Sequence, residues 1–437
     1  MEANLETTKD PGPPQKTILI KFTFILFGIG SLLAWNAILT ELSFLDFFVH
    51  KLDPFESTSF LNFAPNIIFQ FILLWKKNLF KIEKQVIYGL ISSIILLILL
   101  PISIIGFKEH EDTNMGLTIV LILTMGLINA LLCSGFFAFV SSFPLEMIID
   151  FSTGQGFAGI FLNAIMYVII PSVDSIDERE KKEKLMAIIF FSISVFVLLI
   201  CLLFFIFSLK TEYFIYYLYK NKQHTNIGEI NEEGETEGNY NDTNNGENTR
   251  LTDYNLKTNQ EVSILQMFFL LWEIDLLCIF IYFVTFAMFP VAFENQNIFH
   301  LNKYNMNTVL TLYNVFDTFG RFLVSAVTPT KIKAYLSILP RGILLVTIVL
   351  NYYFEYEDYN HTFTSLFLIF NISMLGLTNG IGTTLCFGIA PFLVNDELKG
   401  QAGSSVSLFT IIGIFIGSCF AFLTKHILKK IHEVKKK

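Results

Sequence analysis

Charged side chains are scarce in this chain. They make up 16% of its 437 residues, whereas a soluble domain carries about 25%. Hydrophobic residues account for 53%, and 48 residues are phenylalanine; a soluble protein this apolar would still need a charged shell to stay dissolved. The shortage of charge therefore excludes a soluble globular enzyme, a disordered chain and a coiled coil. It indicates a polytopic membrane protein.

The residues and motifs of common membrane enzymes are missing as well. The five cysteines lie in apolar runs and show neither a disulfide framework nor the spacing of a zinc site. All seven histidines lie outside those runs, and the HExxH, GxGD and Walker A patterns are absent. We therefore expect no enzyme, no metal and no bound cofactor. The classes that remain are a secondary carrier or channel and a membrane scaffold that does not transport.

Long apolar runs, by contrast, are abundant. A helix that crosses about 30 Å of hydrocarbon needs about 20 mostly apolar residues, and a window of that size finds eleven candidates. They cover residues 20–43, 57–75, 86–106, 115–143, 154–173, 186–208, 265–293, 305–328, 334–353, 362–390 and 401–424. The sequence thus predicts an all-α polytopic protein of about eleven transmembrane helices.

The segments around these helices complete the predicted organisation. Residues 210–262 are rich in Asn, Glu, Gly and Thr and cannot bury enough apolar surface to fold, so we expect a disordered acidic loop that divides the bundle into six helices and five. Most of the net charge of −8 lies in this loop, which gives no case for a nucleic-acid partner. The predicted segments are a polar cytoplasmic tail (1–17), helices one to six (18–209), the acidic cytoplasmic loop (210–262), helices seven to eleven (263–425) and a basic C-terminal tail (426–437).

Loop charge predicts the orientation, because basic loops stay in the cytoplasm. The loop after the second helix, residues 76–84, is strongly basic, whereas the loops at 108–112 and 355–358 are acidic. This pattern predicts a cytoplasmic N-terminus. Two basic segments, 179–184 and 425–437, fall on the opposite side under this assignment.

A charged pair lies inside the eighth predicted helix. A charge at the bilayer centre costs about 2.5–3.5 kcal/mol, yet Asp317 and Arg321 are both there. They are four residues apart and share one helix face, with Asn314 one turn before Asp317. The pair is either an internally neutralised contact that holds helices together or a polar clamp for a hydroxylated solute. Arg341, in the ninth helix, is the other intramembrane arginine.

Other interior residues are weaker signals. Trp35 and Asn36 lie in the first helix, away from the interface that tryptophan usually prefers, and either pack or line a site. Asn129 and Cys133 lie along one stretch of the fourth helix.

Small and acidic residues in the last helices also have two interpretations. Asn379 lies in the tenth helix, and Gly413 and Gly417 form a small-xxx-small pattern that usually marks close helix packing. Glu273 and Asp275 either mark the cytoplasmic entry of the seventh helix or form a proton relay.

Several short motifs occur in the order found in one transporter family. They are Leu33-Ala34-Trp35-Asn36, Gly154-Gln155-Gly156-Phe157-Ala158-Gly159, Phe289-Pro290, Asp317-x-x-Gly320-Arg321, Thr378-Asn379-Gly380 and Ala402-Gly403. Over about residues 32–423 the chain thereby resembles the equilibrative nucleoside transporter family, and the combination is more specific than any single motif.

This resemblance implies a facilitative carrier for purine or pyrimidine nucleosides and nucleobases. It also implies a bundle similar to the major facilitator fold, in which two halves rock around a central site. Asp317 and Arg321 would then contact the ribose. The residues expected to contact substrate are Asp317, Arg321, Trp35, Asn36, Asn314, Asn129, Cys133 and Phe289. Those expected to pack or gate are Gly154, Gln155, Gly159, Pro290, Arg341, Asn379, Gly413 and Gly417.

The chain departs from the family at Cys133, where many relatives carry glutamine. An amide donates and accepts hydrogen bonds to a base edge, whereas a thiol does so only weakly. Asn129, one turn earlier, is the candidate replacement.

The expected function is therefore facilitative transport of purine nucleosides or nucleobases by alternating access. The expected partners are the small-molecule substrate and the lipid bilayer, and the expected location is the plasma membrane, with an intracellular membrane as the alternative. Two other functions stay open: proton-coupled symport through Asp317 or the Glu273 and Asp275 pair, and a non-transporting scaffold. Because Phe, Ile, Lys and Asn share AT-rich codons, the composition suits a parasite such as an apicomplexan that salvages host purines.

Overall fold

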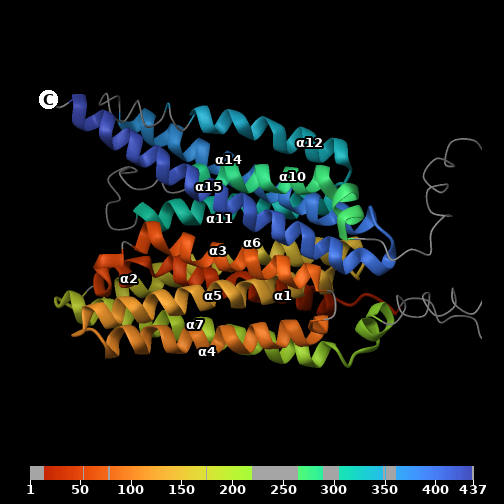
Figure 1. Ribbon diagram of the computed structural model, residues 1–437, viewed down its shortest axis with the longest axis horizontal. Helices are drawn as coiled ribbons and strands as arrows, with labels where there is room; N and C mark the ends of the chain where they lie inside the picture. The colour runs from red at the N-terminus through yellow and green to blue at the C-terminus, as the bar shows by residue number, and fades with distance from the viewer. Residues whose placement is uncertain are drawn as a thin grey trace, which may run out of the picture.

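The computed structural model describes residues 14–52, 54–76, 79–173, 175–218, 264–288, 305–347, 350 and 361–435 of the chain. Every regular element in these ranges is helical, and the long helices lie side by side in one bundle (Figure 1). Backbone groups in lipid must find their hydrogen bonds inside the protein, and a helix satisfies them within its own segment. The predicted all-α architecture is confirmed.

Six long helices make up the first lobe. They are α1 (Ile18–Thr40), α3 (Pro54–Trp75), α4 (Ile82–Gly106), α5 (Glu111–Val140), α6 (Leu145–Ser172) and α7 (Arg179–Ser208), with the short α2 (Leu42–Phe48) after α1. Each corresponds to one predicted span. The largest difference is at α6, which begins nine residues before the predicted residue 154 because Pro144 is its N-cap and the apolar residues Met147, Ile148 and Ile149 of its first turns are buried in protein.

The second lobe contains α10 (Ile264–Met288), α11 (Asn305–Leu323), α12 (Lys331–Ile338), α14 (His361–Ile389) and α15 (Lys399–Lys435). The ninth predicted span, 334–353, is not one continuous helix. A 3₁₀ turn, η5 (Leu339–Arg341), interrupts it, because Pro340 has no N–H to donate and its ring disturbs the preceding turn. Likewise α11 ends at Leu323 rather than at residue 328.

Nine of the described helices are long and apolar enough to cross a membrane. Helix α11 falls short of that criterion because asparagines, Asp317 and Arg321 lower its hydropathy, and the segment around α12 because it is broken. Both nevertheless run alongside the others in Figure 1. Together they account for the eleven predicted spans and their division into six and five.

Two segments predicted to lie outside the helices, the acidic loop and the basic C-terminal tail, are partly helical in the structure. Residues 212–218, at the start of the predicted acidic loop, are helical, and Phe214 stacks on Phe24 with ring centroids 5.4 Å apart. An apolar ring gains more from this aromatic cluster than from solvent, which explains the order there. Residues 219–262 of the loop lie outside the described ranges. Helix α15 continues through most of the predicted basic tail, to Lys435.

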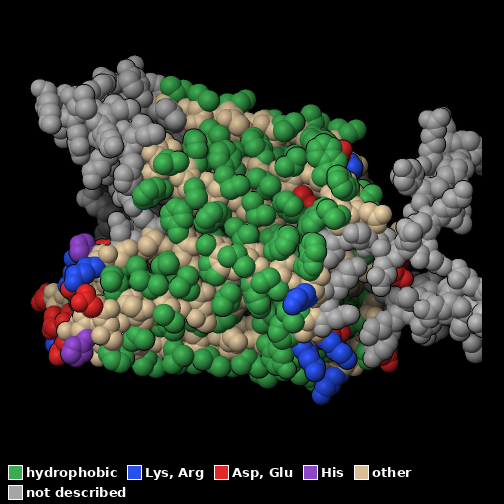
Figure 2. Space-filling model, viewed as in Figure 1, with side chains coloured by type: hydrophobic (Ala, Val, Ile, Leu, Met, Phe, Trp, Pro, Cys, Tyr) green, Lys and Arg blue, Asp and Glu red, His purple; other side chains and the backbone are tan. Residues whose placement is uncertain are grey.

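The surface matches a membrane environment. Hydrophobic side chains cover the middle of the molecule, and most charged side chains lie at its two ends (Figure 2). Fully apolar side chains are exposed in the middle of their helices, such as Phe196 of α7 (63% exposed) and Ile95 of α4 (51% exposed). Because large apolar patches are rare on soluble monomers, this belt is the lipid-facing surface.

Glycines allow two helix pairs to touch backbone to backbone. A Cβ atom added at Gly154 of α6 would overlap the carbonyl oxygen of Ile25 in α1. On the other lobe, Cβ atoms at Gly413 and Gly417 of α15 would fall 2.6 Å and 2.7 Å from the carbonyl oxygens of Ile279 and Phe283 in α10. Small residues at membrane helix contacts increase dispersion contacts in this way.

Enlarging Gly154 should therefore destabilise the protein. We expect Gly154→Leu to separate α1 from α6 and to lower thermal stability in detergent by at least the ~1–3 kcal/mol typical of overpacking. Gly116→Leu is the matched control, because a Cβ at Gly116 in α5 would meet no atom within 4 Å. Equal melting temperatures for the two variants would contradict the close contact.

Candidate functional site

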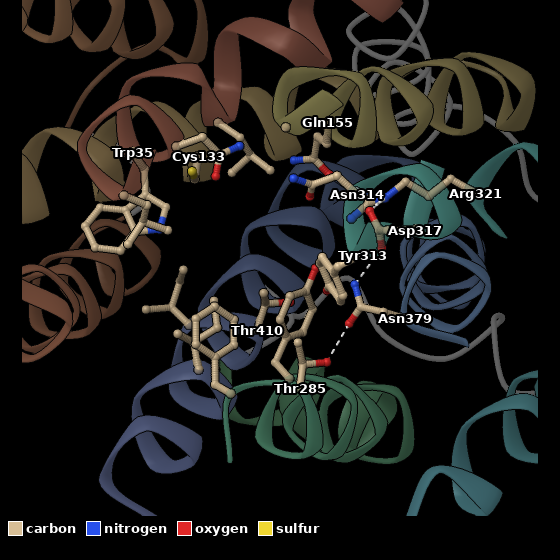
Figure 3. A pocket seen from close by; sticks show the side chains of 18 of the residues that line it. Trp35, Cys133, Gln155, Thr285, Tyr313, Asn314, Asp317, Arg321, Asn379 and Thr410 are labelled. Carbon is tan, nitrogen blue, oxygen red and sulfur yellow. Dashed lines mark hydrogen bonds and ion pairs between the residues drawn. The ribbon is translucent and has the colours of Figure 1, made fainter. Parts of the chain in front are cut away.

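A cavity of about 160 Å³ lies between the two lobes (Figure 3). That is many times the ~10–15 Å³ that a single water requires by the same measure. Helices α1, α5 and α6 of the first lobe line it together with α10, α11, α14 and α15 of the second. A site shared by both lobes can respond when one moves against the other.

The walls of the cavity are largely apolar and aromatic. Trp35, Tyr282, Phe286 and Tyr313 contribute rings, and the Trp35 ring is held by Phe63 at a centroid distance of 4.9 Å. The aliphatic part of the lining consists of Leu32, Leu39, Leu310, Ile411 and Ile414. These surfaces suit a flat, partly apolar solute.

The polar part of the cavity is built around the ion pair of α11. Arg321 Nε donates to Asp317 Oδ2 at 2.8 Å, and the two side chains are only 4% and 6% exposed. Four residues along a helix is the spacing at which two side chains meet, so the contact requires no distortion of α11.

Arg321 also joins the two lobes. Its Nη1 donates to the Ser152 carbonyl oxygen at 3.0 Å and to Gln155 Oε1 at 3.2 Å, both on α6. Gln155 in turn donates from Nε2 to Ser31 Oγ of α1 at 3.2 Å. The hydroxyl of Ser152 lies 2.7 Å from that of Thr384 on α14. The guanidinium is therefore bonded to neutral groups of the first lobe and to the carboxylate of its own helix.

Asp317 connects the pair to the second lobe. Asn379 Nδ2 donates to Asp317 Oδ1 at 2.7 Å, and Asn379 Oδ1 accepts from the Thr285 hydroxyl at 2.9 Å. Arg341 Nη2 donates to the same hydroxyl at 2.7 Å, and its Nη1 donates to the Thr378 hydroxyl at 2.6 Å. Within the described part of the chain Arg341 has no carboxylate partner and is held by hydroxyl and carbonyl oxygens.

Most of the residues expected at a substrate site come together here. The cavity lining includes Trp35, Asn36, Cys133, Asn314, Asp317 and Arg321. Asn129 is placed elsewhere: its Nδ2 donates to Asn62 Oδ1 of α3 at 3.0 Å, and it does not line the cavity. Phe289 lies outside the described residues.

The residues expected to pack or gate fall into two groups. Gln155, Gly159 and Asn379 also line the cavity, and Gly159 leaves the space that the Asn314 carboxamide occupies. The others that the structure describes, Gly154, Arg341, Gly413 and Gly417, lie outside the lining. Pro290 lies outside the described residues.

Sequence reasoning missed several lining residues, namely Asn163, Tyr282, Thr285, Tyr313, Ser407 and Thr410. A spacing signal was available for one of them, because Asn163 follows Gly159 by one turn of α6. A four-residue spacing also relates Thr58, Asn62, Asn66 and Gln70 of α3, which are buried polar residues that do not line the cavity.

The two acidic residues of α10 differ in their surroundings. Glu273 is paired, because Lys331 Nζ donates to its Oε2 at 2.7 Å. Asp275 is 2% exposed; its Oδ2 accepts from Ser405 Oγ at 3.1 Å, and its Oδ1 has no hydrogen-bond partner. No cation lies within salt-bridge distance of Asp275 among the described residues.

Comparison with known proteins gives consistent results. A family model described as "Nucleoside transporter" matches residues 118–426. The chain is 22% identical to Equilibrative nucleotide transporter 4 of Arabidopsis thaliana, over 91% of this chain and 92% of that one. It is 21% identical to Equilibrative nucleoside transporter 1 of Homo sapiens, over 97% of this chain and all of that one.

Solved structures show the fold. The major facilitator superfamily proton:xylose symporter XylE matches with a TM-score of 0.64 at 14% identity, covering 94% of this chain and 90% of that one. The E. coli fucose:proton symporter FucP matches with a TM-score of 0.55 at 13% identity, covering 94% and 93%. The two-lobed bundle is therefore a major facilitator fold.

The bond between Asn379 and Asp317 should be important for stability. Asn379→Asp keeps the shape but replaces the donor by an acceptor beside a carboxylate, so we expect a loss of about 1.5–3 kcal/mol, measured as thermal stability in detergent at pH 7. Asn371→Asp is the control, because Asn371 is buried on the same helix without a bonded carboxylate. If the two variants lose equal stability, burial of charge explains the loss and the bond to Asp317 contributes little.

Proposed function

Because the chain belongs to the nucleoside transporter family, we propose that it carries nucleosides and nucleobases, purines above all, down their concentration gradients across a membrane. The proposal depends on one observation: the cavity between the lobes has aromatic walls and holds the Asp317 and Arg321 pair. A nucleoside has the matching form, with a flat base and a sugar that bears several hydroxyls.

The ion pair keeps unused hydrogen-bonding capacity for a sugar. Each carboxylate oxygen of Asp317 accepts one bond within the described chain and has a second lone pair. Arg321 uses Nε and Nη1, and its Nη2 makes no hydrogen bond to a described residue. Asp317 can thus accept from one sugar hydroxyl while Arg321 donates to another, and the rings hold the base by stacking.

Alternating access requires a closed end that can open. Three contacts join the lobes near the α5–α6 and α14–α15 connections: Ser134 with Ser404 at 3.1 Å, Ser152 with Thr384, and the Phe137 ring with that of Phe387 at 4.4 Å. We propose that these contacts form the gate at this end and separate when the lobes rock. The loop charges favour a cytoplasmic position for this end and for the N-terminus, and we propose the plasma membrane as the location.

Uptake by the purified protein tests this function. Proteoliposomes should take up radiolabelled adenosine saturably, and unlabelled purine nucleosides should compete. Uptake should stop when the inside and outside concentrations are equal. A correctly inserted protein without saturable uptake would favour the scaffold interpretation instead.

Arg321→Lys should separate a ribose contact from a structural role. Lysine keeps the charge beside Asp317 but loses the planar fork of donors. We expect near-normal insertion and a larger loss of affinity for adenosine than for adenine, which has no ribose, measured by competition in proteoliposomes. If the ratio of the two affinities in the variant equals that in the wild type, the ion pair contributes to stability and does not contact the ribose.

A second candidate function is proton-coupled symport, and Asp275 favours it. Of the three acids predicted from the sequence as proton carriers, Asp317 is neutralised by Arg321 and Glu273 by Lys331. Asp275 is buried and faces Ser405 of α15, with Cys278 of its own helix and Cys386 of α14 nearby. An unpaired carboxylate is costly in a membrane unless it takes up a proton.

An imposed pH gradient distinguishes the two functions. Under symport, an inward proton gradient should drive adenosine above its external concentration, and Asp275→Asn, which mimics the protonated acid, should abolish that accumulation while leaving exchange intact. Glu273→Gln is the control and should keep the accumulation. Uptake that never exceeds equilibrium in the wild type would exclude coupling and leave Asp275 as a neutral hydrogen-bonding group.

A further inference from the structure

Three carboxamides that line the cavity make no hydrogen bond to any described residue. They are Asn36 of α1, Asn163 of α6 and Asn314 of α11. Among them Asn163 is the most enclosed: its side chain is 2% exposed and its Nδ2 is buried without a partner. An unpaired buried donor costs about 1–3 kcal/mol. A residue that lines a cavity and has an unpaired donor is suited to bind a solute.

The position of Asn163 along α6 places it away from the ion pair. Gln155, which bonds to Arg321, precedes Asn163 by eight residues, which is about 12 Å along a helix axis. On α11, Leu310 lines the cavity seven residues before Asp317, about 10 Å away along that helix. The cavity therefore extends from the ion pair at one end to Asn163 and Leu310 at the other.

Helix α1 reaches the same level. A Cβ at Gly28 would lie 2.8 Å from the Gln155 backbone nitrogen, so these two residues are neighbours. As the first and fifth long helices of the bundle, α1 and α6 run in the same direction. Asn36, eight residues after Gly28, thus lies near the level of Asn163. Asn314 instead lies one turn from Asp317 and belongs to the end that holds the ion pair.

We propose that Asn163 reads the hydrogen-bonding edge of the nucleobase and so determines which bases the carrier accepts. This inference rests on the proposed function and deepens it, because a nucleoside whose sugar is held by Asp317 and Arg321 directs its base toward the other end of the cavity. A carboxamide presents a donor beside an acceptor, the pattern that pairs with the 6-amino group and N7 of adenine.

The same assignment accounts for the thiol at Cys133. Cys133 lines the cavity, but its Sγ faces the Ser31 carbonyl oxygen at 3.6 Å, and a thiol is a weak hydrogen-bonding group in any case. Asn129 is bonded to Asn62 and does not line the cavity. Asn163 is then the amide that supplies base recognition in this chain, from α6 rather than from α5.

The test compares substrates that differ only at the base edge. Adenosine and purine riboside share the ribose, but purine riboside lacks the 6-amino group. In proteoliposome competition assays we expect Asn163→Ala to lower the affinity for adenosine about tenfold more than the affinity for purine riboside, because only adenosine also loses the hydrogen bond to its 6-amino group. Arg321→Lys should instead lower the affinities for both nucleosides equally. Asn371 is a buried carboxamide outside the cavity, so Asn371→Ala should change neither affinity.

Each outcome decides the matter. Equal loss of both nucleosides in Asn163→Ala, or no loss, overturns the assignment. If that variant fails to fold, the wild type still tests the proposal. Equal affinities of the wild type for adenosine and purine riboside would mean that no group bonds to the 6-amino group. A tenfold preference for adenosine in the wild type, kept only in part by Asn163→Ser, would support the proposal. Failure of the proposed function looks different, because the wild type would then take up no nucleoside at all.

Discussion

The ion pair between Asp317 and Arg321 is the interaction on which the centre of this protein depends. Removing one charge would leave the other uncompensated in a low-dielectric bundle at a cost of about 3–5 kcal/mol, and at 2.8 Å each compensates the other. The remaining hydrogen-bonding capacity of the pair then organises its neighbours: Ser152 and Gln155 of the first lobe accept from the guanidinium, and Asn379 of the second lobe donates to the carboxylate. The polar end of the cavity exists because the two charges compensate each other and residues of both lobes bond to them.

The same arrangement reconciles stability with movement. Both members of the pair lie on α11, so the charges stay together when the lobes separate. The bonds that cross between the lobes, from Arg321 to Ser152 and Gln155, involve neutral acceptors. Each contributes about 1.5–3 kcal/mol, less than the ~3–5 kcal/mol that breaking a buried charge pair would cost. A carrier can therefore break and remake its contacts between lobes without exposing an uncompensated charge to lipid. Glycine contacts occur both within a lobe, as at α10 with α15, and between the lobes, as at Gly156 of α6 with Thr318 of α11.

The polar residues inside this membrane protein thus fall into two groups, according to whether their side chains are hydrogen-bonded within the protein. Arg341, Thr285 and Asn379 form a hydrogen-bonded network that holds the second lobe together. Asn36, Asn163 and Asn314 line the cavity, and their amides make no hydrogen bond to a described residue. The first group stabilises the fold and the second is available to a solute. Residue type alone does not separate them, because both groups contain asparagine.

The sequence by itself determined the all-α fold, the positions of most helices and the Asp317–Arg321 contact, because hydropathy over 20 residues and a four-residue spacing are local properties. The tertiary structure alone decided which faces meet. It placed Asn129 against Asn62 of α3 and Asn163 in the lining of the cavity, and it made Gln155 a partner of Arg321. The direction of a side chain on a membrane helix is set by the helices packed against it. Those neighbours come from distant parts of the chain, which no local pattern records.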